Sequence, residues 1–401
     1  MTPAVAPAAR ATRAPFEVLR AAPADGSTLA RRGRLRLPHG DVETPQFMPV
    51  GTNATVKALD ADDLAATGAS IVLANTYHLY LRPGEQRIQR LGGLHRFMAW
   101  DRPILTDSGG YQVVSLDQLR SIDDDGVTFK SHLDGSTHRL TAERSMEIQA
   151  ALGADVAVAF DQPVFPSSPR AVVADATART HRWAERSLEA HRTSAQATEL
   201  GQSLFGVIQG GLDPELRAES TQFIASLPFD GLNIGGLAGD ETPIQRAAAL
   251  RVVVPLLADD PRPRYLMGLG SPMDLLEAVD LGVDLFDSVL PARVARTGQV
   301  WVPGGRLNLR NAAFLDDPEP IQDGCPCPAC RHYARAYLAH LFRARELLAY
   351  RLATCHNLTY TLDFMARIRA AIEAGRFAEL RSELRVRAGW TGYDAAAGEP
   401  A

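Results

Sequence analysis

The 401-residue chain has no apolar run long enough to span a membrane, and its first residues lack the continuous apolar stretch of a secretory signal. It contains only four cysteines, too few for a disulfide framework in a chain of this size. Residues 1–14 are rich in alanine and proline and are expected to form a disordered tail, and residues 389–401 a second flexible one. These absences favour a cytoplasmic protein with no membrane partner.

A strong net charge is missing as well. The formal net charge of −5 does not indicate a nucleic-acid binder. Nearly all of the positive charge is arginine, and residues 291–351 hold nine Arg against five Asp or Glu, a local excess of about +4. A solvated helical surface has the same composition, but a local basic face of this kind is also sufficient to hold phosphates.

Eight short apolar runs, each ending at or beside Gly, Asn, Gln or Asp, are the main positive signal. They are residues 47–50, 71–75, 104–107, 156–161, 204–209, 232–235, 265–268 and 285–287. Such runs, separated by helix-length stretches, are typical of buried parallel strands, and eight of them predict an α/β fold, a (β/α)8 TIM barrel. Because the C-terminal ends of barrel strands share one mouth, Asp107, Asp161, Gln209 and Asp287 are expected to converge there.

Several segments add to the barrel pattern. Alternation of Arg and Leu within residues 16–41 predicts a small antiparallel cap, and residues 127–140, centred on Asp134-Gly135-Ser136, predict a β-hairpin insertion. Ser271 before Pro272 predicts the start of a helix. The amphipathic stretch 361–387 predicts a helix that packs on the barrel.

Three cysteines lie within six residues. Cys325, Cys327 and Cys330 suit a tetrahedral zinc ion, and a site with four protein ligands is structural because no position is left for substrate. Spacing leaves the fourth ligand open among His332, His340, Cys355 and His356. The alternative is three unliganded core cysteines. We expect one TIM-barrel domain over residues 15–388, which includes a C-terminal zinc-binding subdomain at about 306–358.

Two segments after predicted strands carry reactive groups. Asp107-Ser108-Gly109-Gly110 combines a carboxylate with glycines that let a ligand approach, and Tyr111 offers a stacking face; a simple Asp-capped turn is the alternative. Asp287 is followed by Arg293 and Arg296, which places a nucleophile beside phosphate-binding groups unless the three form a structural salt bridge.

The fourth and fifth runs provide polar groups that suit a purine. Asp161 can accept the two adjacent N–H donors of a base such as guanine, and Gln209 with a glycine amide can bind its carbonyl oxygen. Buried polar partners of this kind discriminate strongly against wrong bases.

These motifs resemble those of the bacterial-type tRNA-guanine transglycosylases, or queuine tRNA-ribosyltransferases, from about Phe16 to Arg387. The shared motifs are Thr76-Tyr77-His78-Leu79, Asp107-Ser108-Gly109-Gly110, Gln209-Gly210-Gly211, Gly235-Gly236-Leu237, Asp287 with Leu290-Pro291-Ala292-Arg293, and the cysteines with His356-Asn357-Leu358. The resemblance implies a barrel with one structural zinc per subunit that acts on tRNA as a homodimer. It also implies exchange of guanine at the wobble position (34) of GUN-anticodon tRNAs (Asp, Asn, His, Tyr) for a 7-deazaguanine, usually preQ1.

The resemblance also implies a role for each residue. Asp287 is the nucleophile that forms a covalent tRNA–enzyme intermediate, and Asp107 is the general acid and base. The expected base-binding residues are Ser108, Tyr111, Asp161, Gln209, Gly236, Leu237 and Met267. Arg293 and Arg296 are expected to contact tRNA, and His356 to complete the zinc site.

The chain departs from the family pattern at several positions. Tyr111 stands in place of Phe, Ala292 in place of Thr, Thr297 in place of Asn, and Gln162-Pro163 in place of an acidic residue and cysteine. Gly239 occupies a position that is typically Val in preQ1-using enzymes and Gly in queuine-using ones. Loss of an isopropyl group makes room for a larger 7-substituent, so acceptance of queuine as well as, or instead of, preQ1 is a hypothesis.

Two other classes of protein fit the sequence less well. A non-catalytic RNA-binding subunit on the same fold predicts loss of the nucleophile or general acid, yet Asp107 and Asp287 are both present. A barrel metal hydrolase predicts His and Asp ligands at the strand ends, but the cysteines lie outside the barrel runs and those ends have no His.

Overall fold

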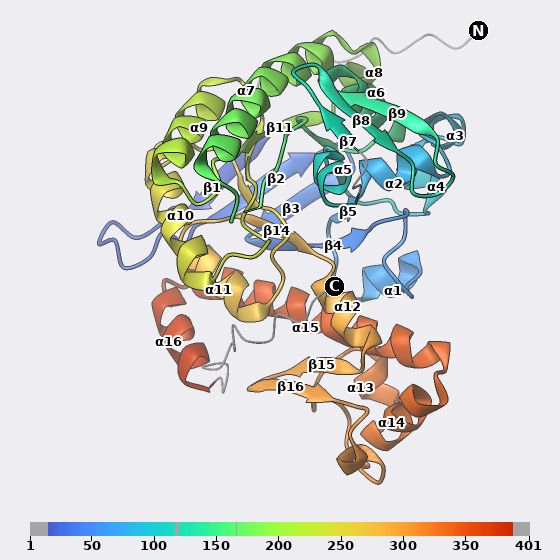
Figure 1. Ribbon diagram of the computed structural model, residues 1–401. Helices are drawn as coiled ribbons and strands as arrows, with labels where there is room; N and C mark the ends of the chain where they lie inside the picture. Colours follow the sequence, from blue (N-terminus) through green and yellow to red (C-terminus); the bar gives the residue numbers. More distant parts are fainter. Residues whose placement is uncertain (1–14, 117–119, 166, 388–401) are drawn as a thin grey trace, which may run out of the picture.

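Eight parallel strands close into a barrel at the centre of the computed structural model, which describes residues 15–116, 120–165 and 167–387 (Figure 1). They are β4 (Gln46–Gly51), β5 (Val72–Ala74), β6 (Ile104–Thr106), β10 (Val156–Val158), β11 (Ser203–Ile208), β12 (Gly231–Ile234), β13 (Arg264–Leu266) and β14 (Leu285–Ser288). Pairing of β14 with β4 closes the ring. Each predicted run overlaps one of these strands, so the (β/α)8 fold is confirmed. The two predicted tails, residues 1–14 and 389–401, lie outside the described residues.

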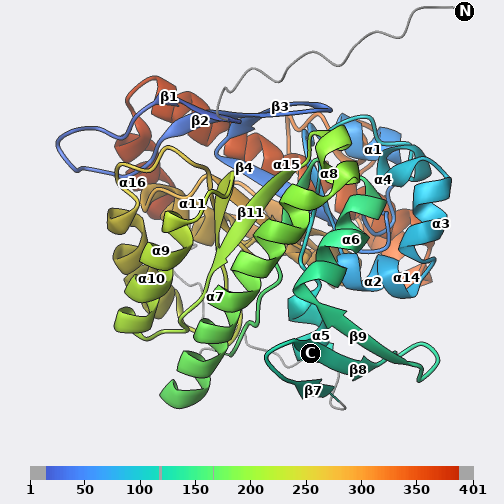
Figure 2. The same ribbon diagram turned by 90° about the horizontal axis from the view of Figure 1, so that it is seen from above.

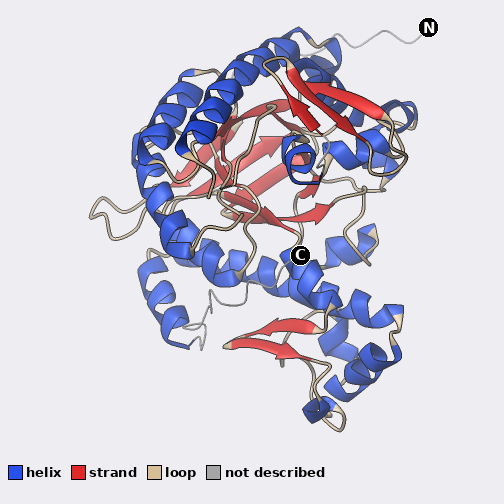
Figure 3. Ribbon diagram, in the orientation of Figure 1, coloured by secondary structure: helices blue, strands red, loops and turns tan. Residues whose placement is uncertain are grey.

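Side chains alternate along the strands between two layers of the core. Met48 and Val50 belong to an inner cluster formed with strands across the barrel, whereas Phe47 belongs to an outer cluster between the strands and the helices. Helices cover this outer layer (Figure 3). They include α1 (Ala61–Ala66), α2 (Thr76–Leu81), α3 (Glu85–Arg90), α4 (Gly93–Phe97), α6 (Ala142–Leu152), α7 (Arg170–Thr193), α8 (Ala195–Leu200), α9 (Pro214–Ser226), α10 (Pro243–Leu256) and α11 (Pro272–Asp280). As predicted, Ser271 caps α11 by accepting a hydrogen bond from the Asp274 amide.

The predicted antiparallel cap closes the end of the barrel where the strands begin (Figure 2). It consists of β1 (Phe16–Arg20), β2 (Arg32–Leu37) and β3 (Gly40–Thr44), and Phe16 and Leu35 join the inner cluster. The other end of the barrel therefore remains as the mouth.

A buried carboxylate ties this cap to the barrel. Asp155 accepts hydrogen bonds from the backbone amides of His39 and Ile104, and its two oxygens lie 2.8 Å from His39 Nδ1 and 3.0 Å from His95 Nε2. The two imidazole rings stack with centroids 3.5 Å apart and planes 15° apart. The trio therefore forms a hydrogen-bonded strut between the cap and the barrel.

The predicted insertion lies at the mouth and is a three-stranded sheet. After α5 (Gly110–Leu116), it contains β7 (Arg120–Ile122), β8 (Gly126–Lys130) and β9 (Thr137–Thr141) (Figure 2). The β8–β9 hairpin is as predicted. The short strand β7 was missed because three residues are too few to show an alternating pattern.

The chain leaves the barrel after α12 (Leu290–Arg296) and returns with α15 (Leu347–Glu373). Between them lie β15 (Gln299–Val302), β16 (Gly305–Asn308), the 3₁₀ turn Ala312–Phe314, α13 (Pro328–His332) and α14 (Arg335–Ala344), grouped beside the barrel in Figure 1. The helix predicted over 361–387 is in fact two, because α15 ends before Gly375, which has a φ of +68°, and α16 (Phe377–Arg387) follows. Helix α15 packs against α12 and β4, as expected of that segment. The limits of 306 and 358 for a subdomain remain a prediction.

None of the described helices is long and apolar enough to cross a membrane.

Candidate active site

The four polar residues predicted to converge all follow or end barrel strands on the same side. Asp107 directly follows β6, and Gln209 directly follows β11. Asp161 lies just beyond β10, and Asp287 is the penultimate residue of β14. Asp107, Asp161 and Gln209 are buried, and Asp287 keeps part of its surface accessible. The mouth therefore holds three carboxylates and one amide, as the strand-end rule predicts.

Asp161 is held between two neighbouring strand ends. Ser108 Oγ donates to its Oδ1 over 2.7 Å, and Gln209 Nε2 donates to its Oδ2 over 2.8 Å. Gly110 is needed for this approach, because a Cβ there would lie 2.4 Å from the Asp161 carbonyl oxygen. Burial raises the pKa of Asp161 to about 6 against the lowering effect of both hydrogen bonds, and the Asp107 charge adds to the rise.

Asp107 is fixed by three donors from two elements. Its Oδ2 accepts from Asn75 Nδ2 at 2.6 Å and from Gln112 Nε2 at 2.8 Å, and its Oδ1 accepts from the Thr76 amide at 2.7 Å. Burial nevertheless raises its pKa, so proton uptake is easier than for an exposed aspartate. Asn75 ends a predicted strand and Thr76 belongs to one of the shared motifs, but neither of them nor Gln112 was predicted to support Asp107.

Asp287 is held through one oxygen only. Tyr265 Oη donates to Oδ1 over 2.6 Å, and the Gly268 amide donates to the same atom over 2.7 Å. No described residue donates to Oδ2. Burial raises the pKa of Asp287 to about 6, and the Asp107 charge contributes, while the pKa of Tyr265 rises well above its usual value and keeps the hydroxyl protonated. Tyr265 was not predicted as a site residue.

The loop after β12 lies against Gln209. Gly236 has a φ of +68°, and a Cβ on it would lie 2.7 Å from Gln209 Oε1, an atom that has no hydrogen-bond partner among the described residues. Leu237 is buried and Met267 is half-buried, whereas Tyr111 at the start of α5 is 54% exposed. The structure thus brings Ser108, Asp161, Gln209 and Gly236 together and leaves Tyr111 accessible.

A small basic hollow of about 200 Å³ adjoins the Asp287 strand. It is lined by Ser288, next to Asp287, and by Lys57, Arg293 and Arg296. Neither arginine forms an ion pair with a carboxylate of the described residues, so the structural salt bridge considered for Asp287 is absent. Lys57 was not predicted, because an isolated lysine carries no pattern.

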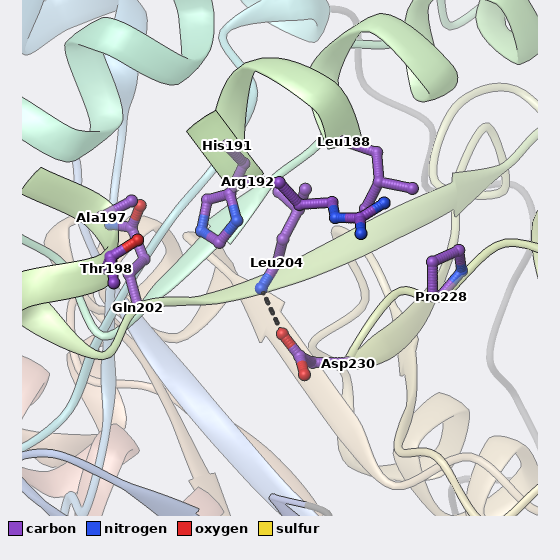
Figure 4. A pocket seen from close by; sticks show the side chains of 9 residues that line it. All are labelled: Leu188, His191, Arg192, Ala197, Thr198, Gln202, Leu204, Pro228 and Asp230. Carbon is purple, nitrogen blue, oxygen red and sulfur yellow. Dashed lines mark hydrogen bonds between the residues drawn. The ribbon is translucent and has the colours of Figure 1, made fainter. Parts of the chain in front are cut away.

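A second hollow, of about 300 Å³, lies at the opposite end of the barrel (Figure 4). Leu204 and Asp230, at the beginnings of β11 and β12, lie beside it, and the Leu204 amide donates to Asp230 over 2.9 Å. Its position at the amino-terminal ends of the strands separates it from the carboxylates of the mouth.

The three predicted cysteine ligands, from the segment between α12 and α15, meet His356, which lies within α15. His356 Nδ1 lies 3.8 Å from Cys325 Sγ, 3.5 Å from Cys327 Sγ and 3.3 Å from Cys330 Sγ. Donors about 2.1–2.3 Å from one tetrahedral ion are separated by about 3.6 Å, so the four atoms fit a single metal ion. His356 Nε2 lies 2.7 Å from the Trp301 carbonyl, which fixes the tautomer that leaves Nδ1 free for a metal.

The other candidates for a fourth ligand lie outside this group. Cys355 is buried, and burial raises the pKa of its thiol to about 12, whereas His332 and His340 are not among the clustered donors.

Comparisons with known proteins identify the family of this chain. The family model described as queuine tRNA-ribosyltransferase matches residues 25–388. A queuine tRNA-ribosyltransferase of Moorella thermoacetica is 52% identical over 360 residues, covering 90% of this chain and 94% of that protein. One of Cereibacter sphaeroides is 51% identical over 351 residues, covering 87% and 92%. The chain therefore belongs to the queuine tRNA-ribosyltransferase family, the bacterial-type tRNA-guanine transglycosylases, which are pentosyltransferases.

Proposed function

We propose that the protein exchanges guanine at the wobble position of GUN-anticodon tRNAs for preQ1, through a covalent bond between Asp287 and the tRNA ribose. The observation that carries this proposal is the pairing of two differently held carboxylates at one mouth. Asp287 is held at Oδ1 only, whereas Asp107 is held at both oxygens. Family membership and the match over residues 25–388 support the same assignment.

In the first step, the free Oδ2 of ionised Asp287 attacks the anomeric carbon of the wobble ribose. A C–O bond forms, the bond from that carbon to guanine breaks, and the electron pair of the broken bond stays on the base. The hydrogen bonds from Tyr265 and Gly268 hold the other carboxylate oxygen and favour the ionised form.

Asp107 supplies a proton to the departing guanine and takes one from the incoming base. Its raised pKa suits the first role, and ionisation after proton transfer is stabilised by Asn75, Thr76 and Gln112. The incoming base then attacks the same carbon and releases Asp287. Two displacements at one carbon retain its configuration, as in retaining glycosidases.

The base is read by the buried group around Asp161. Its carboxylate accepts the adjacent N–H donors of guanine or preQ1, and the Gly236 amide with Gln209 binds the carbonyl oxygen. Tyr111 and Met267 stack on the two faces of the base, and the Leu237 carbonyl lies near the 7-substituent. The burial of Asp161 and Gln209 supports this specificity, because a wrong base leaves them unpaired.

Arg293 and Arg296 contact the anticodon nucleotides, and we add Lys57 to them. The three cations border the same hollow next to the Asp287 strand, and neither arginine is neutralised by a described carboxylate. The anticodon loop is single-stranded, so its wobble base is extruded at lower cost than a base in a duplex.

We further propose that Cys325, Cys327, Cys330 and His356 hold one structural Zn²⁺ per subunit, and that the protein acts as a cytoplasmic homodimer. Three thiolates and an imidazole form a donor set that zinc prefers. The ion orders the segment between α12 and α15 and takes no part in the exchange.

The incoming base is preQ1, with queuine as the second candidate. Gly239 favours queuine, because it is exposed in the loop after Gly236 and has no side chain to limit a 7-substituent.

Exchange of labelled guanine into an unmodified GUN-anticodon tRNA tests the proposal. The zinc-loaded parent is expected to incorporate label and Asp287→Ala to incorporate none. A folded, zinc-loaded parent that incorporates no label would contradict the proposal and favour the non-catalytic RNA-binding subunit.

A further inference from the structure

Arg217 is a fully buried arginine directly below the base-reading loops. It belongs to the first turns of α9 and has no exposed surface. Its Nε donates to the Gly211 carbonyl at 2.7 Å, its Nη2 to the Gly235 carbonyl at 2.8 Å and its Nη1 to the Ile208 carbonyl at 3.3 Å. The three carbonyls flank Gln209 and Gly236, so one side chain joins the loops after β11 and β12.

The guanidinium has no anionic partner in direct contact. No carboxylate of the described residues lies within ion-pair distance of it, and Glu241, whose charge raises the Arg217 pKa, is paired with Arg246 at 2.9 Å. Burial lowers the pKa of Arg217 to about 9, which still leaves it charged at neutral pH. A buried cation without a counter-ion lowers the stability of the fold, so a role in function would explain why an arginine is placed here.

The hydrogen bond to Gly235 has a direct effect on the base site. The Gly235 carbonyl and the Gly236 N–H belong to one peptide group. A charged donor on the carbonyl polarises that group and makes its N–H a stronger donor. The approach is close: a Cβ on Gly236 would lie 3.5 Å from Arg217 Nη2, and one on Gly210 would lie 2.7 Å from the Arg217 backbone nitrogen. Gly210 therefore allows α9 to reach the loops.

We infer that Arg217 is a positioning residue for base departure: through the Gly235–Gly236 peptide it stabilises negative charge on the base carbonyl oxygen. This inference rests on the proposed function, in which the Gly236 amide binds that oxygen. When the glycosidic bond breaks, its electron pair remains on the purine and spreads to the carbonyl oxygen until Asp107 delivers a proton. A polarised Gly236 N–H is most useful at that moment.

Single-turnover guanine exchange by the zinc-loaded protein tests the inference. Arg217→Met is expected to slow the chemical step about 10- to 100-fold and to leave the KM for tRNA within about twofold of the parent value. One hydrogen-bond donor aimed at a developing oxyanion contributes about 10²–10³-fold in rate, and the effect of Arg217 is smaller because it acts through a peptide group. Arg217→Lys, which keeps a cation, is expected to recover part of the rate and covers the case in which the Met variant fails to fold.

Arg264→Met is the matched control. Arg264 is also a buried arginine that donates to backbone carbonyls, those of Leu257 and Gly282, but it lies at the beginning of β13, away from the mouth. Equal slowing by Arg217→Met and Arg264→Met, or a raised KM with an unchanged chemical step, overturns the inference and leaves the proposed function intact. Absence of exchange by the parent overturns both.

Discussion

The hydroxyl of Tyr265 and the carboxylate of Asp287 form a 2.6 Å hydrogen bond across neighbouring strands β13 and β14. The bond comes from a residue whose own pKa is raised well above its usual value, so Tyr265 stays a donor over the working pH range. It lowers the pKa of Asp287 from the higher value that burial alone would impose. Tyr265 therefore extends toward lower pH the range in which the proposed nucleophile is ionised.

Tyr265→Phe is expected to move the acidic limb of activity to higher pH. The attacking carboxylate must be ionised, so kcat/KM is lost as the pH falls through the Asp287 pKa of about 6. Loss of one hydrogen bond to the ionised form, worth about 1 kcal/mol, raises that pKa by roughly 0.7 unit. The pH profile of guanine exchange measures the shift. Tyr360→Phe, in α15, serves as control and is expected to leave the limb in place; an unmoved limb in Tyr265→Phe contradicts the assignment.

Gly239→Val is expected to narrow the choice of incoming base. With the base bound as proposed, a valine side chain at this exposed loop position would occupy space near the 7-substituent. The ratio of queuine to preQ1 incorporation is therefore expected to fall at least about tenfold, the scale of steric discrimination in a pocket. Competition between the two bases at equal concentration measures this ratio. Strong preference for preQ1 by the parent, with no change in the variant, would exclude queuine as a substrate.

Cys330→Ala and Cys355→Ala separate a metal ligand from its neighbour. Cys330 Sγ lies 3.3 Å from His356 Nδ1, whereas Cys355 is outside the cluster. We expect Cys330→Ala to lose bound zinc and to unfold the segment between α12 and α15 at lower temperature, because metal binding contributes folding free energy. Cys355→Ala is expected to retain one zinc per subunit. Elemental analysis with limited proteolysis gives the readout, and equal zinc content in the two variants would be incompatible with the ligand set.

Asp155→Asn is expected to destabilise the attachment of the cap. The Asp155 carboxylate accepts hydrogen bonds from two backbone amides and contacts two imidazole rings. The asparagine side chain has only one acceptor oxygen and cannot accept from all four groups, so a loss of about 2 kcal/mol in the free energy of unfolding is expected at pH 7. These interactions lower the pKa of Asp155 despite its burial. The contribution is therefore present above pH about 4 and lost as the pH falls through the lowered folded-state pKa. Urea unfolding at several pH values measures the difference.

For that comparison Asp41→Asn, an exposed cap residue, provides the control and is expected to change stability little. Equal unfolding midpoints for Asp155→Asn and the parent at pH 7 would rule out the strut.

Much of the fold follows from local patterns in the sequence. Each barrel strand is a short apolar run bounded by turn residues, and Ser271 before Pro272 marks the start of α11. The convergence of Asp107, Asp161 and Asp287 could be predicted because each lies at the end of a strand, and a strand end can be recognised from the local sequence. The cysteine spacing likewise indicates the metal site without knowledge of the fold.

The supporting contacts were not predictable in the same way. Gln209 and Asp161 are 48 residues apart, and Tyr265 and Asp287 are 22 apart, so their hydrogen bonds depend on the register of neighbouring strands. Arg217 and Lys57 are single residues without a repeating pattern, and only the packed barrel places them beside the mouth. The choice of His356 as the fourth member of the metal-binding cluster required the structure or a family resemblance, since spacing left four candidates.

Direct observation of the covalent intermediate tests the account most sharply. The zinc-loaded protein would be incubated with a GUN-anticodon stem-loop, quenched in denaturant and analysed by denaturing gel and intact mass. We predict a one-to-one protein–RNA adduct that lacks guanine and disappears on addition of preQ1, with none formed by Asp287→Asn. Guanine exchange that persists in Asp287→Asn, or an adduct that maps to another residue, would contradict Asp287 as the nucleophile.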